Sequence, residues 1–222
     1  MAQSGSLSAR DYLAAIYEMA EEGIPTVQAG LARWIGVSAA SVSEAVKRLR
    51  RDRLLVSKGR VLLFTPTGEE EARRLVRRHR LAERFLIEVI GLRWHQAHEE
   101  ASAWERVISD QVEERLTVLL DDPATCPHGN PIPGSTHPAD LEGLQPLRDF
   151  GAGDRVILLR LTEDLELELD VMRYFEENGL MPGGEILVVD TAPDGTMTLE
   201  VRSRTVGLGA ELTDNLWVRR AA

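Results

Sequence analysis

Histidine and acidic side chains recur at helical spacing in the middle of this 222-residue chain. His79 and Glu83 stand four residues apart, so on a helix their side chains project from the same face. In the segment that follows, His98, Ser102 and Glu105 share a face for the same reason. Metal sites in helical bundles are built from imidazole and carboxylate groups that facing helices direct toward each other. The spacing therefore predicts a metal site between these two segments.

Two further places offer metal-binding groups. Asp11, at the start of the first expected helix, would add a carboxylate, and Cys126-Pro127-His128 places a thiol and an imidazole two residues apart in a loop. Each group also has an ordinary alternative, since Glu83 could pair with Arg80 or Arg84 and a Cys-x-His pair often arises by chance. Mostly carboxylate and imidazole ligands suit Mn²⁺ or Fe²⁺, whereas a bound thiolate favours softer ions. Manganese is the first expectation.

The N-terminal third has the pattern of a helix-turn-helix. Apolar residues at helical spacing predict helices over 11–20, 27–35 and from Ser38 to about Asp52. Gly36-Val37-Ser38 supplies a tight turn between the second helix and the third, as helix-turn-helix units require.

A basic hairpin follows the third helix. Two short apolar runs, 54–56 and 61–64, flank Ser57-Lys58-Gly59-Arg60, where Gly59 can adopt the positive φ of a hairpin turn. The hairpin has the position of the wing in a winged helix.

The third helix and the wing are the predicted DNA-reading surface. Small polar groups at the start of the helix can approach base edges, and cations further along can contact phosphates. The alternative is that these charges form an ordinary solvated face. The residues predicted to contact DNA are Ser38, Ser41, Ser43, Glu44, Lys47 and Arg48, with Arg60 on the wing.

The charge distribution is compatible with this role. The chain has a formal net charge of −10, which by itself argues against a nucleic-acid partner. Residues 1–64, however, contain 9 Lys and Arg against 6 Asp and Glu, and the acidity is concentrated in residues 121–222.

Two apolar-striped segments follow the wing. Thr67 and Glu70 have the spacing of a capping box and predict a helix that continues to Gly91. A second long helix is predicted from His95 to about Leu120, with His95 itself at the surface. Their apolar surface favours a dimer interface, with internal packing as the alternative.

The last hundred residues predict a loop and then a small β domain. Residues 121–151 are rich in proline and glycine, as loops are. Short alternating runs around Pro182-Gly183-Gly184 and Asp194-Gly195 predict a small β-barrel, with a helix over 172–178.

Composition limits the class of protein. The first residues show no apolar signal core, and no segment approaches the roughly 18 apolar residues of a membrane span. A single cysteine, Cys126, excludes an internal disulfide. We therefore expect a soluble cytoplasmic protein.

Several strings of residues resemble the iron- and manganese-dependent repressors related to the diphtheria toxin repressor. The resemblance covers nearly the whole chain and implies a homodimer with two metal sites per subunit that binds DNA when loaded with metal. It also implies an SH3-like domain at the C-terminal end. The strings are Asp11-Tyr12-Leu13 to Ile16-Tyr17-Glu18, Arg78 to Arg84, Trp104-Glu105, Cys126 to Gly134 and Gly179 to Gly183.

The resemblance implies a ligand set for one site. It would use His79, Glu83 and His98, or, in relatives with the Cys-Pro-His-Gly loop, Glu83 with Cys126 and His128 plus an acidic residue of the C-terminal domain. The first candidate for that acidic residue is Glu168, followed by Glu163, Asp164 and Asp170.

The other implied site departs from the family pattern. It would use Asp11, Glu105 and the residues at 102 and 106, but Ser102 replaces a Cys or Glu and Arg106 replaces a His. An arginine side chain has no lone pair available to coordinate a cation, and its positive charge would repel one. The site is therefore either lost, with Arg106 pairing with Asp11 or Glu105, or rebuilt from the neighbours Glu99, Glu100 or His98.

These observations predict a mainly α protein with a small β domain. We expect a winged helix over 1–72, a helical dimerisation and metal-binding domain over 73–140, and an SH3-like β-barrel over 141–222. The expected function is a Mn²⁺- or Fe²⁺-dependent regulator that binds double-stranded operator DNA as a homodimer and represses metal-uptake genes.

Two other functions are alternatives to this one. A winged-helix regulator could instead respond to a non-metal effector through its C-terminal domain, with structural histidines. An enzyme is disfavoured because no His-Glu-x-x-His helix and no nucleophile with a base is evident. Neither a membrane nor a small-molecule substrate is expected as a partner.

Overall fold

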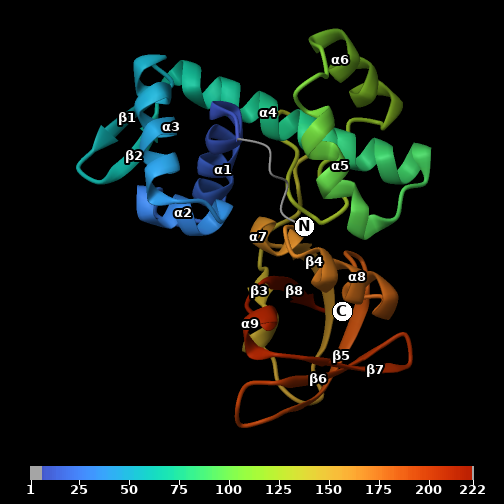
Figure 1. Ribbon diagram of the computed structural model, residues 1–222. Helices are drawn as coiled ribbons and strands as arrows, with labels where there is room; N and C mark the ends of the chain where they lie inside the picture. Colours follow the sequence, from blue (N-terminus) through green and yellow to red (C-terminus); the bar gives the residue numbers. More distant parts are fainter. Residues whose placement is uncertain (1–6, 222) are drawn as a thin grey trace. The chain divides into compact units, whose positions relative to one another are not determined.

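The chain divides into two compact units, Met1–Arg78 (unit 1) and His79–Ala222 (unit 2), of which the computed structural model describes residues 7–221 (Figure 1). Residues 1–6 of the predicted winged helix therefore lie outside the described residues. The three predicted domains stay a prediction, because the helical segment and the β domain fall together in unit 2. Within the described chain, no helix has the length and apolarity that a membrane span requires.

Unit 1 begins with three helices: α1 (Ala9–Glu21), α2 (Gln28–Ile35) and α3 (Ala39–Arg51) (Figure 1). Gly36 ends α2 with a left-handed φ of 74°, and the Ser38 side chain caps α3 by accepting a hydrogen bond from the Ser41 backbone N–H. The predicted helix-turn-helix is confirmed. Its buried residues include Leu13, Ile16, Leu31, Val42, Val46 and Leu49.

The wing is a two-stranded antiparallel hairpin, β1 (Leu55–Lys58) and β2 (Val61–Phe64). Gly59 in its turn has a φ of 62°, as predicted. The Thr26 hydroxyl donates a hydrogen bond to the Leu62 carbonyl at 2.7 Å, and this buried contact ties the hairpin to the helices.

Helix α4 (Pro66–Phe85) begins two residues earlier than predicted. The Thr65 hydroxyl accepts a hydrogen bond from the Gly68 N–H at 3.0 Å, so the capping box predicted at Thr67 and Glu70 is wrong. Pro66 occupies the first helical position, where its missing N–H costs nothing. A π-helical turn (Leu86–Ile90) continues α4 to Gly91, whose φ is 81°.

The predicted second long helix is interrupted. A 3₁₀ turn (Trp94–Gln96) leads into α5 (Ala97–Trp104), and a separate helix, α6 (Asp110–Leu119), begins after a short turn. Ser109 caps α6 by accepting from the Val112 N–H at 3.3 Å. This cap starts a new helix although the apolar spacing runs on across it.

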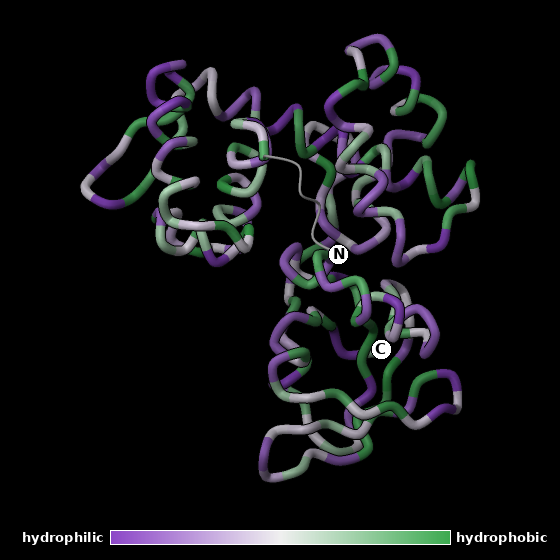
Figure 2. The backbone as a smooth tube through the Cα atoms, viewed as in Figure 1, coloured by the Kyte–Doolittle hydropathy of each residue, from purple (hydrophilic) through white to green (hydrophobic). Residues whose placement is uncertain are grey.

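The C-terminal part of unit 2 is a six-stranded antiparallel sheet with the order β3-β8-β4-β5-β6-β7, which confirms the small β domain (Figure 1). Short helices α7 (Glu163–Glu166) and α9 (Ala210–Thr213) and the longer α8 (Leu169–Asn178) lie between strands in the chain. Figure 2 shows β4 and β5 as predominantly hydrophobic, and both contribute to the core. The strands are β3 (Gln145–Pro146), β4 (Arg155–Leu161), β5 (Glu185–Thr191), β6 (Met197–Val201), β7 (Arg204–Leu208) and β8 (Leu216–Arg220).

The loop over 124–134 is held against β4 by backbone contacts. The Leu161 N–H of β4 donates to the His128 carbonyl at 2.9 Å. Within the loop, the Cys126 N–H donates to the Asn130 carbonyl at 2.7 Å. Gly129 has a φ of 91°, and a Cβ there would lie 2.0 Å from the Leu159 carbonyl oxygen. Only glycine allows the loop to approach the strand this closely.

Candidate metal centre

Six side chains with metal-binding groups meet inside unit 2. They come from four elements that lie far apart in the sequence: α4, α5, the loop over 124–134 and α7. All six are buried or nearly so. The six residues, called the cluster below, are His79, Glu83, His98, Cys126, His128 and Glu166.

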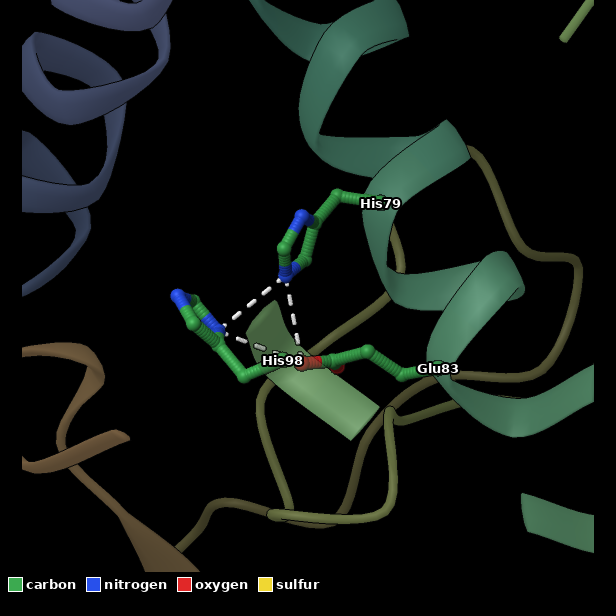
Figure 3. Close-up of side chains that lie close together, drawn as sticks. All are labelled: His79, Glu83 and His98. Carbon is green, nitrogen blue, oxygen red and sulfur yellow. Dashed lines mark hydrogen bonds and ion pairs between the residues drawn. The ribbon is translucent and has the colours of Figure 1, made fainter. Parts of the chain in front are cut away.

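His79, Glu83 and His98 face one another, as predicted (Figure 3). His79 Nε2 lies 3.1 Å from Glu83 Oε1 and 3.2 Å from His98 Nδ1. His98 Nδ1 is 3.3 Å from the same Glu83 oxygen. The separation of four residues on α4 places His79 and Glu83 one turn apart, and α5 brings His98 to them.

The loop and α7 complete the cluster. His128 Nδ1 lies 2.9 Å from Glu166 Oε2 and 3.4 Å from Glu83 Oε1. Glu166 Oε2 is also 3.2 Å from His98 Nδ1. Cys126 Sγ is 3.9 Å from His128 Nδ1, so the Cys-x-His pair points inward to the same place as the helical ligands.

Two buried polar atoms in the cluster have no hydrogen-bond partner in the described structure: Glu83 Oε2 and His128 Nε2. Both side chains are almost fully enclosed, with 1% and 0% of their surface exposed. A buried carboxylate oxygen without a partner is costly, and such atoms point to an ion or ligand at the site. In each of two triads, His79 with Glu83 and His98, and Glu83 with Cys126 and His128, the candidate ligand atoms lie within 4.8 Å of one another. This donor set fits a divalent cation.

The charges of the cluster are balanced by protons when no cation is bound. Burial lowers the pKa of His98, but hydrogen bonds to Glu166 and Glu83 outweigh it and raise that pKa to about 9. Burial likewise opposes the charged form of His79 and His128, yet the neighbouring carboxylates raise the pKa of both well above the ordinary value. The imidazolium groups in turn hold the pKa of Glu83 well below its usual range against burial.

Cys126 is the exception within the cluster. Burial, together with the charges of Glu83 and Glu166, raises the pKa of its thiol to about 12. Without a cation the sulfur is therefore a thiol, and a metal ion that binds the sulfur would have to displace its proton.

Groups behind the cluster hold its members in place. His79 Nδ1 lies 2.8 Å from Glu105 Oε2. Asn130 Nδ2 donates to Glu166 Oε1 at 2.7 Å, and Arg160 Nε donates to Asn130 Oδ1 at 2.5 Å.

A second buried interaction joins α4 to α7. The Arg80 guanidinium donates to Glu163 Oε1 at 3.0 Å through Nε, and both side chains are buried. Glu163 also lies close to His98 and Glu166. It is therefore an ion-pair partner at the edge of the cluster.

Glu166, rather than the first candidate Glu168, lies in the cluster. Glu168 is exposed and precedes α8, whereas Glu166 is buried in the cluster. The segment forms the short helix α7, and in a helix residues three apart lie on one face, which turns Glu163 and Glu166 inward. Asp170 is exposed and Asp164 half-buried. Acidic and leucine residues alternate over 164–169, and this alternation does not indicate a helix.

His95 was predicted at the surface and is buried. Its Nδ1 contacts Glu176 of α8, so it joins the 3₁₀ turn to the β domain. The preceding Trp94 packs its ring 4.8 Å from that of His128.

The residues of the other predicted site are not assembled as that prediction required. Ser102 donates its hydroxyl to the His98 carbonyl at 3.0 Å, and Arg106 is exposed. Asp11 belongs to unit 1, where its carboxylate accepts a hydrogen bond from the Ser8 N–H at 2.6 Å and caps α1. Glu105 contacts His79, and the neighbours Glu99 and Glu100 are exposed.

The predicted DNA-reading residues lie on α3 and the wing of unit 1. Ser43 is the exception to their exposure, because it is half-buried. Ser38 and Ser41 hydroxyls lie 2.8 Å apart at the start of α3, and Arg48 contacts Asp52 at 3.9 Å. The exposed members are Ser38, Ser41, Glu44, Lys47, Arg48 and Arg60.

Three family models match consecutive parts of the chain. Residues 6–61 match a model described as the iron dependent repressor N-terminal DNA binding domain. Residues 65–134 match the iron dependent repressor metal binding and dimerisation domain, and residues 145–220 match the FeoA domain.

Curated proteins and solved structures match over most of their length. The iron-dependent repressor IdeR of Mycobacterium tuberculosis is 38% identical over 200 residues, which cover 86% of each chain. The diphtheria toxin repressor of Corynebacterium diphtheriae is 36% identical over 213 residues, 92% of each chain. A manganese-dependent transcriptional repressor in complex with manganese superposes with a TM-score of 0.81 at 31% identity, over 96% of this chain and all of the other. ScaR with bound Zn²⁺ gives 0.77 at 30% identity, over 97% of this chain and all of the other.

Proposed function

Because this chain belongs to the family of iron-dependent repressors, we propose that its buried cluster is the centre through which a divalent cation controls DNA binding. The chain is a metal-dependent DNA-binding repressor, as its family and relatives indicate.

The ligands proposed are drawn from the six residues of the cluster. The observation that carries the proposal is the convergence of three imidazoles and two carboxylates, in which Glu83 Oε1 lies 3.4 Å or less from nitrogens of His79, His98 and His128. The other Glu83 oxygen, Oε2, and His128 Nε2 are buried without a hydrogen-bond partner in the described structure. Glu83 belongs to both triads, one with His98 of α5 and one with Cys126 and His128 of the loop. When bound, the cation supplies the positive charge that protons supply in its absence.

Mn²⁺ or Fe²⁺ fits the ligands, and we place Mn²⁺ first. Three imidazoles and two carboxylates are borderline and hard donors that suit these ions. The Cys126 thiol must lose a tightly held proton to bind, which disfavours a site that depends on sulfur. Relatives named as iron-dependent and manganese-dependent are both found.

Binding of the cation to the cluster would fix the position of helix α4. His79 and Glu83 lie on α4, which follows the wing directly in the chain. Loading would exchange the protons on the cluster's imidazoles for one cation that holds α4, α5, the loop and α7 together. We propose that this selects the arrangement of the homodimer in which both α3 helices reach operator half-sites, about 34 Å apart in successive turns of DNA.

The homodimer agrees with apolar groups left exposed in unit 2. Val107, Val118 and Leu119 have 79%, 75% and 59% of their surface exposed, on and beside α6. Exposed apolar surface of this kind marks protein interfaces. We further propose that the protein is not an enzyme, acts in the cytoplasm and represses metal-uptake genes.

The proposal is tested by selecting bound sequences from a library of randomised DNA duplexes with Mn²⁺ and with chelator. Sequence-specific retention is expected only with Mn²⁺. Glu83→Gln and His128→Gln should abolish it, while Glu200→Gln, at an exposed carboxylate of β6, should not. Equal retention in chelator, or full retention by both cluster variants, would remove the cluster from the function.

A further inference from the structure

The Glu105 carboxylate lies directly behind the His79 ring. Glu105 follows the last residue of α5, and its Oε2 is 2.8 Å from His79 Nδ1. Both side chains are buried, with 9% and 10% exposed. A carboxylate only accepts hydrogen bonds, so Nδ1 carries the proton that joins them.

This contact fixes which nitrogen of His79 faces the cluster. With Nδ1 committed to Glu105, Nε2 points to Glu83 Oε1 at 3.1 Å and to His98 Nδ1 at 3.2 Å. Histidines that bind metals usually donate their other N–H to a carboxylate or carbonyl, which sets the tautomer and makes the ligand nitrogen more basic. The contact between His79 Nδ1 and the Glu105 carboxylate is of this kind.

The neighbours of Glu105 do not offer the rest of a separate site. Ser102 uses its hydroxyl as a donor to the His98 carbonyl one turn back on α5. Arg106 places a cation immediately after Glu105 in the chain and cannot coordinate a metal. The residue types that the family resemblance assigns to positions 102 and 106 are therefore replaced by groups without that chemistry.

We propose that Glu105 is a positioning residue that orients His79 toward the cluster, and that it is not a ligand of a second ion. The proposal rests on the cluster being a metal centre. It assigns to this chain a use of Glu105 that differs from the site implied by the resemblance.

The test compares metal binding by the full chain and three variants. Mn²⁺ titration by calorimetry gives the stoichiometry and the Kd of Glu105→Ala, Glu105→Gln and the control Glu200→Gln, at an exposed carboxylate of β6. A positioning role predicts that all three keep the wild-type number of ions per chain. Glu105→Ala should weaken the Kd about 10- to 100-fold, whereas Glu105→Gln should stay within a few-fold because its amide oxygen still accepts from Nδ1.

Nitrogen NMR of His79 supplies a readout that general loss of stability would not move. In the chain loaded with Zn²⁺ as a diamagnetic probe, His79 should keep its proton on Nδ1 in the wild type and in Glu105→Gln. Circular dichroism establishes that each variant is folded. The tautomer of His79 can also be followed in the metal-free chain at high pH, where Nδ1 should remain the protonated nitrogen.

Three results would overturn the proposal. They are the loss of one whole equivalent of Mn²⁺ in Glu105→Ala with the remaining Kd unchanged, a wild-type Kd in that variant, or a His79 that carries its proton on Nε2. If the wild type binds no Mn²⁺, the proposed function fails instead, and the metal-free tautomer still decides whether Glu105 orients the ring.

Discussion

The Asn130 side chain holds one oxygen of Glu166 so that the other faces the cluster. Asn130 Nδ2 donates to Oε1 at 2.7 Å, while Oε2 lies 2.9 Å from His128 Nδ1. Arg160 Nε donates to Asn130 Oδ1, which fixes the amide with its nitrogen toward Glu166. The relay runs from β4 through the loop to α7 and is buried at Asn130.

Removing this relay should weaken metal binding without removing a ligand. We predict that Asn130→Ala raises the Kd for Mn²⁺ about 10- to 100-fold at unchanged stoichiometry, because Glu166 is then free to rotate. Calorimetric titration measures both quantities. Asn178→Ala, on α8 away from the cluster, is the control and should behave like the wild type. A wild-type Kd in Asn130→Ala would show that Glu166 is held by other contacts.

Rising pH should widen the difference in stability between the loaded and the metal-free chain. The pKa of His98 is raised from its ordinary 6.5 to about 9 in the folded protein. Its protonation therefore contributes stability fully below pH 6.5, and this contribution is lost as the pH rises to about 9. In the loaded chain the cation replaces the proton, so its stability should not fall in this window.

Thermal unfolding with Mn²⁺ and with chelator between pH 6.5 and pH 9 measures this difference. The Tm of the metal-free chain should fall across the window, and the gap in Tm should grow. A constant gap would mean that loading displaces no protons from the histidines. His137→Ala, at an exposed histidine outside the cluster, should leave the gap unchanged.

Local patterns in the sequence predict most of the fold and five of the six cluster residues, all except Glu166. The Ser38 cap, the apolar stripe of α3 and Gly59 are each legible from neighbouring residues, and the structure has them where predicted. His79 and Glu83 are predictable for the same reason, because four residues on one helix determine their proximity.

The remaining parts depend on contacts that no local pattern encodes. Glu166 enters the cluster because a short helix follows β4, and the alternation of acidic and leucine residues favours a strand instead. The break before Ser109 is set by a single cap against a continuing apolar spacing. His95 is buried by a partner 81 residues away, Glu176, which spacing cannot indicate.

Adding one methyl group at Gly129 should disrupt the loop that carries the Cys-x-His pair. A Cβ there meets the Leu159 carbonyl oxygen at 2.0 Å, and the φ of 91° is strained for any other residue. We predict that Gly129→Ala lowers the free energy of unfolding by at least about 2 kcal/mol. Denaturant unfolding of the metal-free chain measures the loss.

A matched substitution separates the clash from backbone strain alone. Gly143 also has a positive φ, 71°, but a Cβ there meets nothing within 4 Å. Gly143→Ala should therefore cost only about 1–2 kcal/mol, the strain of the left-handed conformation. If both variants lose the same stability, the close approach of the loop to β4 is not what requires glycine.

Lys47 on α3 should contribute to DNA affinity through a phosphate. It is exposed on the helix that the Ser38 cap begins, whereas the next cation, Arg48, is engaged with Asp52. Each phosphate contact releases condensed counterions and steepens the salt dependence of the binding constant by about 0.9 in a log–log plot. We predict that Lys47→Ala weakens binding to all DNA sequences and reduces this slope by about 0.9 per subunit. Mn²⁺ binding should stay unchanged, because Lys47 lies in unit 1 and the cluster in unit 2.

Fluorescence anisotropy over a series of salt concentrations measures the slope. Arg155→Ala on β4, which removes a surface pair with Glu185, is the charge-matched control. An unchanged slope in Lys47→Ala would place this side chain away from the DNA backbone.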